Sequence, residues 1–413
     1  MSELIADSKE IASLIFNEVA KQTSANFPEK KYRPIPERIG PDSFETAPHR
    51  HSANSDGTGT KPELAERLAM MNNKPQYFEG LGFDLVAMVA DDDARYGRFT
   101  LGIVNSLDVN SADDEEFIHA LARGIKQACD AGKFCLLNAG ETAELGYRTA
   151  GIGKNHLNWN AVAEHLINEH KVIDGSKMRP GNVVVGLREK SIRSNGLTMA
   201  RKILKHAYLN DLHFENERAY AIDLIQRDQR EYIEASVIGE ILDSVRRKGG
   251  LQVEPLISWH EHFPDITAKL LTPSTIYSPL IYEAQGGVDG PLKISLLGCA
   301  HITGRGVPEK AKRMLKGKGL GIDLNAVFPD PEGIPELLEL AVKHGKPGAP
   351  LISDQKACME WNRGVGFLCV VESDAHADDF EKLASEMGYE AKAMGTIIPQ
   401  KLIRWRGHEW TYP

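Results

Sequence analysis

Ser55-Asp56-Gly57-Thr58-Gly59-Thr60-Lys61 combines a carboxylate, two glycines, two threonines and a cation, and it is the segment that most directly indicates the fold. The glycines allow positive φ and a close approach of the backbone to a ligand. The hydroxyls and Lys61 suit phosphate oxygens, while Asp56 suits Mg²⁺, which prefers carboxylate and phosphate ligands. A tight turn capped by Asp56 fits the same residues equally well. The stretch is not a P-loop, because the spacing G-x-x-x-x-G-K-[ST] is missing.

Three further polar segments suit the same kind of ligand. They are Asp91-Asp92-Asp93, Asn138-Ala139-Gly140-Glu141-Thr142-Ala143-Glu144 and Ala300-His301-Ile302-Thr303-Gly304-Arg305-Gly306. Three adjacent carboxylates repel one another, and a divalent cation relieves that repulsion, although a solvated loop carries such a triple as well. Glu141 follows an expected strand and is a third candidate carboxylate for metal or phosphate. The four segments together predict a site for a polyphosphate and its divalent metal.

Two other positions are candidates for acid–base chemistry or anion binding. His301 stands between a strand-like run and a glycine turn, so it suits a general acid or base or an anion contact. A buried structural histidine fits the same pattern. Ser194 and Asn195 precede a helix expected from about Leu197, and the N–H groups at such a helix start suit a phosphate. Simple N-capping is the alternative for these two residues.

Composition limits the class of protein. The 413 residues are enough for two or three domains at ~150 residues each. A net charge of −9 argues against nucleic acid as a partner, because phosphate-backbone binding requires clustered cations. No apolar stretch approaches the ~20 residues that span a bilayer, so no membrane partner is expected. Five cysteines without a C-x-x-C pair predict free thiols in a reducing cytoplasm.

Several other kinds of chemistry lack their motifs. The hydrolase elbow G-x-S-x-G does not occur, and neither does the dinucleotide fingerprint G-x-G-x-x-G. No Cys/His spacing typical of a zinc site is present. These absences argue against a serine hydrolase and against a dinucleotide-dependent oxidoreductase.

Hydrophobic periodicity predicts an α/β (α+β) chain with two halves. A turn-rich segment at 174–182 is the expected boundary, which gives an N-terminal domain at 1–172 and a C-terminal domain at 173–413 with a charged helical insertion at 208–260. Helices are expected in the first ~20 residues and at 117–131, 197–207 and 335–344. Strands are expected at 83–89, ending at the acidic triple, and at 99–107, 135–137, 183–187 and 366–371, with coil or an edge strand over 24–54.

In this order the motifs resemble those of the phosphoribosylformylglycinamidine cyclo-ligase (AIR synthetase) family. Its superfamily includes formylglycinamide ribonucleotide amidotransferase, selenophosphate synthetase, thiamine-phosphate kinase and a hydrogenase maturation protein. The resemblance extends over residues ~55–400. Besides the segments above, it includes Phe83-Asp84-Leu85-Val86-Ala87-Met88, Val172-Ile173-Asp174-Gly175-Ser176-Lys177, Arg193-Ser194-Asn195-Gly196-Leu197, Leu271-Thr272-Pro273-Ser274-Thr275-Ile276-Tyr277 and Trp361-Asn362-Arg363-Gly364-Val365-Gly366.

This resemblance implies an AIR-synthetase-like fold of two α/β domains, and a homodimer whose N-terminal halves pair their sheets into a barrel. It implies ATP and Mg²⁺ in a cleft between the halves. ATP is then expected to activate the amide oxygen of formylglycinamidine ribonucleotide, after which a nitrogen closes the imidazole ring in de novo purine synthesis. Such chemistry depends on positioning the reactants and neutralising phosphate charge.

The site residues implied by the resemblance fall into three overlapping groups. The metal ligands are Asp56, Asp92 and Glu141. The catalytic group is His301, Lys61 and Glu141. The nucleotide-binding group comprises Asp56, Gly57, Thr58, Gly59, Thr60, Lys61, Gly140, Thr142, Ser194 and Asn195.

The chain departs from the family's motifs at several points. Asp91-Asp92 replaces an Asn-Asp pair, Ala139 replaces a glycine, Arg305 stands at the middle glycine of His-Ile-Thr-Gly-Gly-Gly, and Asn105 replaces an aspartate. The family's glycine-rich N-terminal segment has no counterpart in residues 1–50. Two alternatives therefore remain open. One is a related ATP-dependent enzyme acting on another small acceptor, and the other is a catalytically inactive binding or scaffold homologue.

Overall fold

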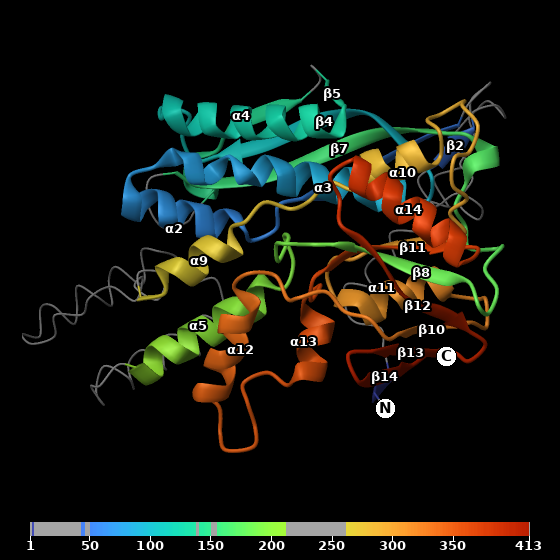
Figure 1. Cartoon of the computed structure of the whole chain (residues 1–413). Coiled ribbons are helices and arrows are strands. Elements are labelled where there is room, and N and C mark those ends of the chain that lie inside the picture. The colour runs from blue at the N-terminus through green and yellow to red at the C-terminus, as the bar shows by residue number, and fades with distance from the viewer. Residues whose placement is uncertain are drawn as a thin grey trace, which may run out of the picture.

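The computed structural model describes residues 2–3, 43–45, 50–137, 140–149, 155–211 and 262–412. Within these ranges the chain is a mixed α/β protein with two sheets and helices packed against both (Figure 1). Three predictions lie outside the described residues: the N-terminal helix, most of the segment 24–49, and the charged insertion beyond residue 211.

The first sheet has six strands in the order β2-β3-β7-β4-β5, with β6 also paired to β4. One face of this sheet packs against helices, because β7 alternates buried residues such as Ala161 and Ala163 with outward-facing ones such as Val162 and Glu164. The strands are β2 (Ser43–Glu45), β3 (Arg50–Gly57), β4 (Phe99–Val109), β5 (Cys135–Leu136), β6 (Glu141–Glu144) and β7 (Leu157–Ile167). The predicted strands at 99–107 and 135–137 are confirmed as β4 and β5.

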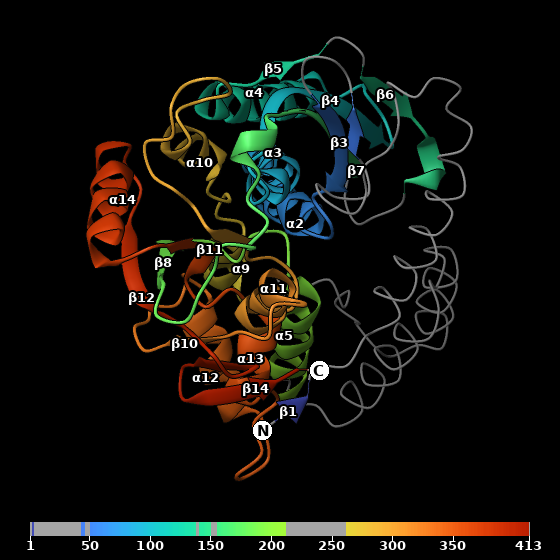
Figure 2. The same cartoon turned by 90° about the vertical axis from the view of Figure 1, so that its right-hand side faces the viewer.

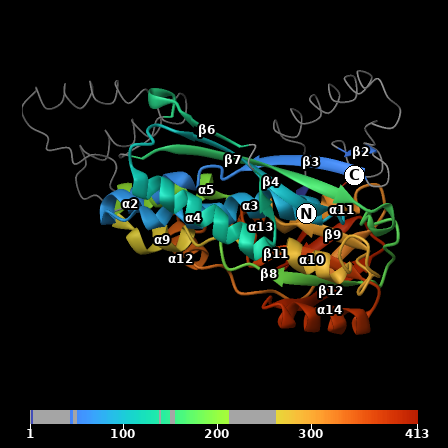
Figure 3. The ribbon, with the colours of Figure 1, turned by 90° about the horizontal axis from the view of Figure 1, so that it is seen from above.

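Helices α2 (Pro62–Asn72), α3 (Gly80–Ala94) and α4 (Glu115–Gly132) lie along one side of this sheet (Figure 3). Asp114 caps α4 by accepting a hydrogen bond from the N–H of Phe117. Helices α3 and α4 approach each other closely at Gly82 and Gly124. A Cβ added at Gly82 would lie 2.2 Å from the carbonyl carbon of Gly124. The predicted helix at 117–131 is thus confirmed, and it is held closely against α3.

The predicted strand at 83–89 is wrong, because this run is the middle of α3. Nearly every residue of α3 is buried, so the helix has no polar stripe that would reveal its period of 3.6. A short apolar run without such a stripe does not distinguish a buried strand from a buried helix. The acidic triple therefore occupies the last turn of a helix and does not form a loop after a strand.

The second sheet has eight strands in the order β1-β14-β13-β10-β12-β8-β11-β9. They are β1 (Ser2–Glu3), β8 (Val183–Arg188), β9 (Gly298–His301), β10 (Gly321–Leu324), β11 (Val365–Val371), β12 (Ala391–Ile398), β13 (Leu402–Trp405) and β14 (His408–Thr411). Every residue of β11 is buried, because α11 (Gly306–Leu315) covers one face while α10 (Ser278–Ala284) and α14 (Asp374–Glu386) cover the other. The predicted strands at 183–187 and 366–371 are confirmed.

Four more helices connect the two sheets: α5 (Leu197–Asp211), α9 (Pro264–Leu270), α12 (Ile334–Lys343) and α13 (Asp354–Glu360). One apolar core joins these helices to α2 and α3, which lie above them in Figure 2. Leu64, Ile203, Leu270 and Leu337 are among the members of this core. Short 3₁₀ turns occur at η3 (Pro75–Phe78), η4 (Gly146–Arg148) and η5 (Glu169–Lys171). Among the described residues no helix is both long and apolar enough to cross a membrane.

Candidate functional site

The loop after β3 contacts the segment that precedes α5. Gly59 has a φ of +61°, and a Cβ placed there would lie 3.2 Å from the carbonyl oxygen of Ser194. The N–H of Thr58 donates to the carbonyl of Trp159 at 3.0 Å, which fixes the loop to β7. Two predicted nucleotide-binding segments, 135 positions apart in the chain, are thus in contact. The positive φ favours glycine at position 59, and a Cβ there would crowd the carbonyl of Ser194.

The segment before α5 also contacts the glycine turn after β9. The N–H of Gly304 donates to the Oδ1 of Asn195. The hydroxyl of Ser194 is buried, and it has no hydrogen-bond partner within the described part of the chain. Because an unpaired buried hydroxyl is costly, this oxygen is well suited to a ligand that completes its hydrogen bonding. Ser194 and Asn195 therefore belong to the same site as the 300–306 turn.

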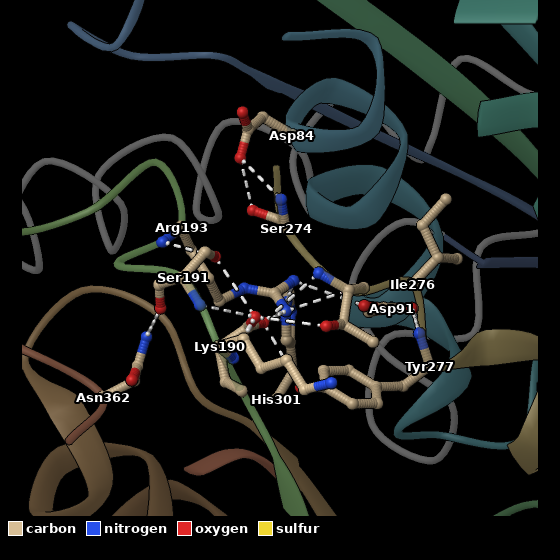
Figure 4. A network of polar contacts seen from close by, with 12 residues as sticks. Asp84, Asp91, Lys190, Ser191, Arg193, Ser274, Ile276, Tyr277, His301 and Asn362 are labelled. Atoms are coloured by element: carbon tan, nitrogen blue, oxygen red, sulfur yellow. Dashed lines mark hydrogen bonds and ion pairs between the residues drawn. The ribbon is translucent and has the colours of Figure 1, made fainter. Parts of the chain in front are cut away.

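Arg193, the residue before Ser194, belongs to a buried network of ion pairs and hydrogen bonds (Figure 4). The guanidinium of Arg193 is 2.7 Å from a carboxylate oxygen of Glu189 and 3.3 Å from one of Asp91, and all three side chains are at most 1 % exposed. The second oxygen of Asp91 accepts from the N–H groups of Tyr277 and Ser278, at 2.8 Å each. Burial raises the pKa of Asp91 to about 6, against the opposing charge of Arg193. The network links α3, α10 and the segment that follows β8.

His301 connects this network to Asp92. Its Nε2 lies 2.7 Å from a guanidinium nitrogen of Arg193, and its Nδ1 lies 3.4 Å from Oδ1 of Asp92. Because arginine only donates, Nε2 must accept, and the proton therefore belongs on Nδ1, facing Asp92. Burial, together with the charge of Arg193, lowers the pKa of His301 to about 3. A neutral histidine of this kind orients Asp92 and does not suit general acid–base catalysis near neutral pH.

Asp92 is the member of the acidic triple that is accessible to a ligand. Its side chain is 33 % exposed and forms an ion pair of 3.2 Å with Arg95. Burial alone would raise the pKa of Asp92, but the charge of Arg95 and the hydrogen bond with His301 hold it well below its ordinary value. Asp92 is therefore ionised over the whole neutral range and is suited to bind a cation.

The three aspartates point in three directions, because successive helical residues are rotated by roughly 100°. Asp91 faces Arg193, Asp92 faces His301, and Asp93 pairs with Arg98 and His165. The triple is therefore not a single carboxylate cluster. Only Asp92 faces the candidate site.

Asp93 begins a chain of polar contacts, here called the relay, that runs from Asp93 through His165 to Thr100. Its acid–histidine–hydroxyl order is that of a hydrolase triad, but its function is different. Oδ2 of Asp93 is 3.1 Å from Nε2 of His165, whose Nδ1 is 3.1 Å from the hydroxyl of Thr100. That hydroxyl is also 2.8 Å from the hydroxyl of Tyr282. Asp93, His165 and Thr100 are buried and Tyr282 is half-buried, so the Thr100 hydroxyl is not open to a substrate, and the relay holds α3, β4, β7 and α10 together.

Lys61 is not an open phosphate contact, in contrast to the prediction. Its ammonium is fully buried, 2.8 Å from Oδ1 of Asp84 and 2.6 Å from the carbonyl oxygen of Thr272. The same carboxylate oxygen of Asp84 accepts from the N–H of Ser274 at 3.2 Å. A buried ammonium needs such partners, because burial without them would be very costly. Lys61 therefore connects the first motif to α3 and to the 272–274 segment.

A lysine that the sequence reasoning missed lies close to the predicted carboxylates. Lys310, on α11, is partly buried, and its charge interacts with both Asp92 and Asp56. Burial lowers the pKa of Lys310 to about 8. One sequence feature could have indicated Lys310: it lies in the first turns of a helix that follows a glycine turn. With Asp56 at the end of β3, these groups offer carboxylates for a metal and a cation for a phosphate.

The structure does not bring Glu141 to these groups within one chain. Glu141 on β6 is opposite Ser106 on β4. Across the next two strand pairs, Ser106 is opposite Asn160 on β7, and Asn160 is opposite Gly57 on β3. Three strand spacings separate β3 from β6 by roughly 14 Å, too far for one ion to bind Asp56 and Glu141. The predicted three-carboxylate set is therefore divided, and Gly140, Glu141 and Thr142 lie on an exposed edge.

Sequence comparisons show similarity to known proteins over most of the chain. Residues 261–406 match the family described as AIR synthase related protein, C-terminal domain. The chain is 26 % identical over 354 residues to a phosphoribosylformylglycinamidine cyclo-ligase of Carboxydothermus hydrogenoformans, with 84 % of this chain and 80 % of the relative covered. It is 27 % identical over 359 residues to the enzyme of the same name from Prochlorococcus marinus, with 86 % and 83 % covered.

Two solved structures share the fold. AaThiL complexed with AMPPCP and TMP gives a TM-score of 0.50 at 12 % identity, with 98 % of this chain and 97 % of that chain covered. The HypE-HypF complex gives a TM-score of 0.50 at 14 % identity, with 95 % and 97 % covered. At these identities the likeness establishes the fold alone.

Proposed function

We propose that this chain, a divergent member of the AIR synthetase family, is an ATP-dependent cyclo-ligase that converts formylglycinamidine ribonucleotide to aminoimidazole ribonucleotide in de novo purine synthesis. One observation carries the proposal. Segments scattered over 250 positions meet in contacts between Gly59 and Ser194, between Asn195 and Gly304, and between His301 and Asp92. Asp92 is held ionised, and the buried hydroxyl of Ser194 has no hydrogen-bond partner among the described residues; both features suit ligand binding better than a scaffold role.

The residues present suit ATP with Mg²⁺. Asp92, held ionised, and Asp56 would bind the metal, while Lys310 and the hydroxyl of Ser194 would contact phosphate oxygens. ATP, when bound, supplies the phosphate that activates the amide oxygen of the ribonucleotide. Arg193, through neutral His301, would keep Asp92 oriented toward the metal. Glu141 is proposed to act on the exposed edge of the sheet and not on the same ion.

Purified full-length chain, given ATP, Mg²⁺ and formylglycinamidine ribonucleotide, is expected to release ADP, phosphate and aminoimidazole ribonucleotide in equal amounts. Coupled detection of ADP together with colorimetric detection of the aminoimidazole product would measure this. Reactions without the ribonucleotide, or with EDTA, are the controls and should show no product. Nucleotide binding without product would favour another acceptor, and absence of nucleotide binding by calorimetry would favour a binding or scaffold homologue.

A related enzyme acting on another small acceptor is the second candidate, and Arg305 is the observation that favours it. Arg305 has a φ of +69° at the start of α11, where the resemblance places a glycine, and its side chain is 34 % exposed. A cation at this position adds positive charge beside the 300–306 turn. An acceptor with an extra carboxylate or phosphate would use that charge.

We also propose a cytoplasmic homodimer with domains at 1–172 and 173–413, whose N-terminal sheets pair into a barrel. The support is the outward face of the first sheet, where Val162 is directly opposite both Val104 and Ser55. Leu101, at the register irregularity of β4 between Thr100 and Gly102, is 41 % exposed. Apolar side chains on a sheet face that no described helix covers suit an isologous contact with a second copy.

A charge on this face is expected to separate the dimer. The unaltered chain should sediment at twice the mass of one chain, and Val162→Lys should sediment as a monomer, because the lysine would be buried without a partner. Val342→Lys is the matched control, since Val342 is 69 % exposed on α12 and its substitution should leave the dimer intact. A monomeric unaltered chain in sedimentation equilibrium at tens of micromolar would contradict the proposal.

A further inference from the structure

Three side chains with different metal-binding atoms converge outside the candidate nucleotide site. They are Asp354 and Cys358, four positions apart on α13, and His408 on β14, which lies beside α13 (Figure 1 and Figure 2). One ligand atom from each lies within 4.8 Å of the other two. The i, i+4 spacing places Asp354 and Cys358 on one face of the helix. The sequence alone does not reveal the group, because fifty positions separate Cys358 from His408.

The spacing of these atoms is close to that of a tetrahedral zinc site. Nε2 of His408 is 2.9 Å from Oδ2 of Asp354. Zinc bonds of about 2.0–2.3 Å place neighbouring ligand atoms roughly 3.3–3.8 Å apart. Side-chain adjustments of less than about 1.5 Å would therefore complete the geometry. A thiolate, an imidazole and a carboxylate together are a donor set that zinc accepts and that Mg²⁺ does not favour.

The surrounding residues hold the carboxylate in the orientation that a ligand needs. Nη1 of Arg363 donates to Oδ1 of Asp354 at 2.8 Å and to Sγ of Cys358 at 3.7 Å, which leaves Oδ2 of Asp354 facing His408. The charge of Arg363 is compensated by Asp330, whose two oxygens accept from its Nε and Nη2 at 2.7 and 2.9 Å. Metal-binding carboxylates are commonly hydrogen-bonded by outer groups in this way. Arg406 also pairs with Asp330 at 3.1 Å, so this carboxylate contacts both neighbouring cations.

Access is possible from one side. Asp354 is half exposed and His408 partly exposed, whereas Cys358 is fully buried behind them. The thiol would thus form the floor of the site. Burial raises the pKa of the Cys358 thiol to about 12, so the free thiol holds its proton in the absence of metal.

We propose that Asp354, Cys358 and His408 form a zinc-binding site that fastens α13 to the C-terminal hairpin of β13 and β14. Binding forms a zinc–sulfur bond and releases the thiol proton to solvent, and a water fills the fourth position. The site also supports the candidate active site, because the carbonyl of Cys358 lies directly under Gly306, where a Cβ would be 2.1 Å away. This role does not depend on the reaction that the chain catalyses.

The test uses the full-length chain, with any purification tag removed, stripped with EDTA and dialysed against Zn²⁺ alone. We expect one zinc per chain by elemental analysis and a rise in Tm on addition of Zn²⁺. Co²⁺ in its place should give a thiolate-to-cobalt charge-transfer band in the near ultraviolet. His408→Ala, at a partly exposed strand position, and Cys358→Ala should each weaken binding at least tenfold, since loss of even an outer-shell partner of a metal ligand costs about 10- to 100-fold.

Cys135→Ala is the matched control, because Cys135 is an exposed cysteine on β5 in the other sheet, and its binding should equal that of the unaltered chain. Zinc stoichiometry that is unchanged in His408→Ala, or a cobalt complex without the thiolate band, would overturn the proposal. Circular dichroism of the two variants without metal verifies that each is folded. If Cys358→Ala fails to fold, His408→Ala alone decides the outcome.

Discussion

Replacing Arg193 with methionine is expected to lower the free energy of unfolding by about 3–5 kcal/mol, the largest stability effect of any single change described for this chain. The substitution removes the guanidinium that forms ion pairs with both Asp91 and Glu189, and leaves both carboxylates fully buried. An uncompensated buried charge costs far more than the pair contributes. Chemical denaturation of the purified variant, followed by circular dichroism, measures the loss.

The loss is expected to shrink as the pH falls. The pKa of Asp91 is already raised to about 6 by burial with Arg193 present, and removing that cation raises it further. A group whose pKa is higher in the folded state takes up its proton on folding, so the variant gains stability relative to the unaltered chain below that pKa. The difference in free energy of unfolding between Arg193→Met and the unaltered chain should therefore be smaller at pH 5 than at pH 8.

Arg123→Met is the matched control for this prediction. Arg123 is exposed on α4 and pairs with Glu79 at 2.8 Å, so its loss should cost less than about 1 kcal/mol. Combining Arg193→Met with Glu189→Gln should cost less than the sum of the two single changes, because the second removes a charge that the first leaves unpaired. An Arg193→Met variant as stable as Arg123→Met would show that the network carries no stability.

Asp92→Asn is expected to reduce turnover by about 100- to 1000-fold, on the scale of losing one preorganised electrostatic contact at a reacting centre. Of the acidic triple, Asp92 alone faces the candidate site, and it is held ionised. Neutralising it removes a ligand for the metal. Stability should change little, because the side chain is partly exposed and asparagine keeps its size. Steady-state kinetics and calorimetry with Mg-ATP measure the two effects.

The control for this second prediction is Asp378→Asn, an exposed aspartate on α14 that has no contact with the site. Its turnover and nucleotide affinity should equal those of the unaltered chain. Equal affinity for Mg-ATP in Asp92→Asn and Asp378→Asn would remove Asp92 from the metal site. A large loss of stability in Asp92→Asn would instead assign the residue a structural role.

Most helices and strands could be predicted from the sequence where one face is buried and the other is not. Helix α4 shows its period because Phe117, Leu121 and Ile125 are buried while the opposite face is exposed. Helix α3 could not be predicted in the same way, since it is buried on nearly all sides and carries no polar stripe. The resulting strand assignment made three aspartates appear to be one cluster.

The sequence predicted which segments form the candidate site better than it predicted the role of each residue in them. Ser194, Asn195, Asp92 and His301 do lie together, as the order of motifs suggested. Lys61 was misassigned as a ligand contact because residue type does not tell an open ammonium from one that a buried carboxylate holds. Lys310 was missed because its place beside Asp92 depends on how α11 packs.

The sequence by itself determined the α/β class, the order of the motifs and therefore the fold, because these depend on local periodicity and on residue types at fixed spacings. Only the tertiary structure decided which groups in the motifs are available for chemistry. The stretch from Ser55 to Lys61 contributes Asp56 and Gly59 at the site, while its lysine is fixed to Asp84 in the interior. Availability depends on burial and on partners distant in the chain, and rotation of roughly 100° per residue along α3 leaves one aspartate of three facing the site.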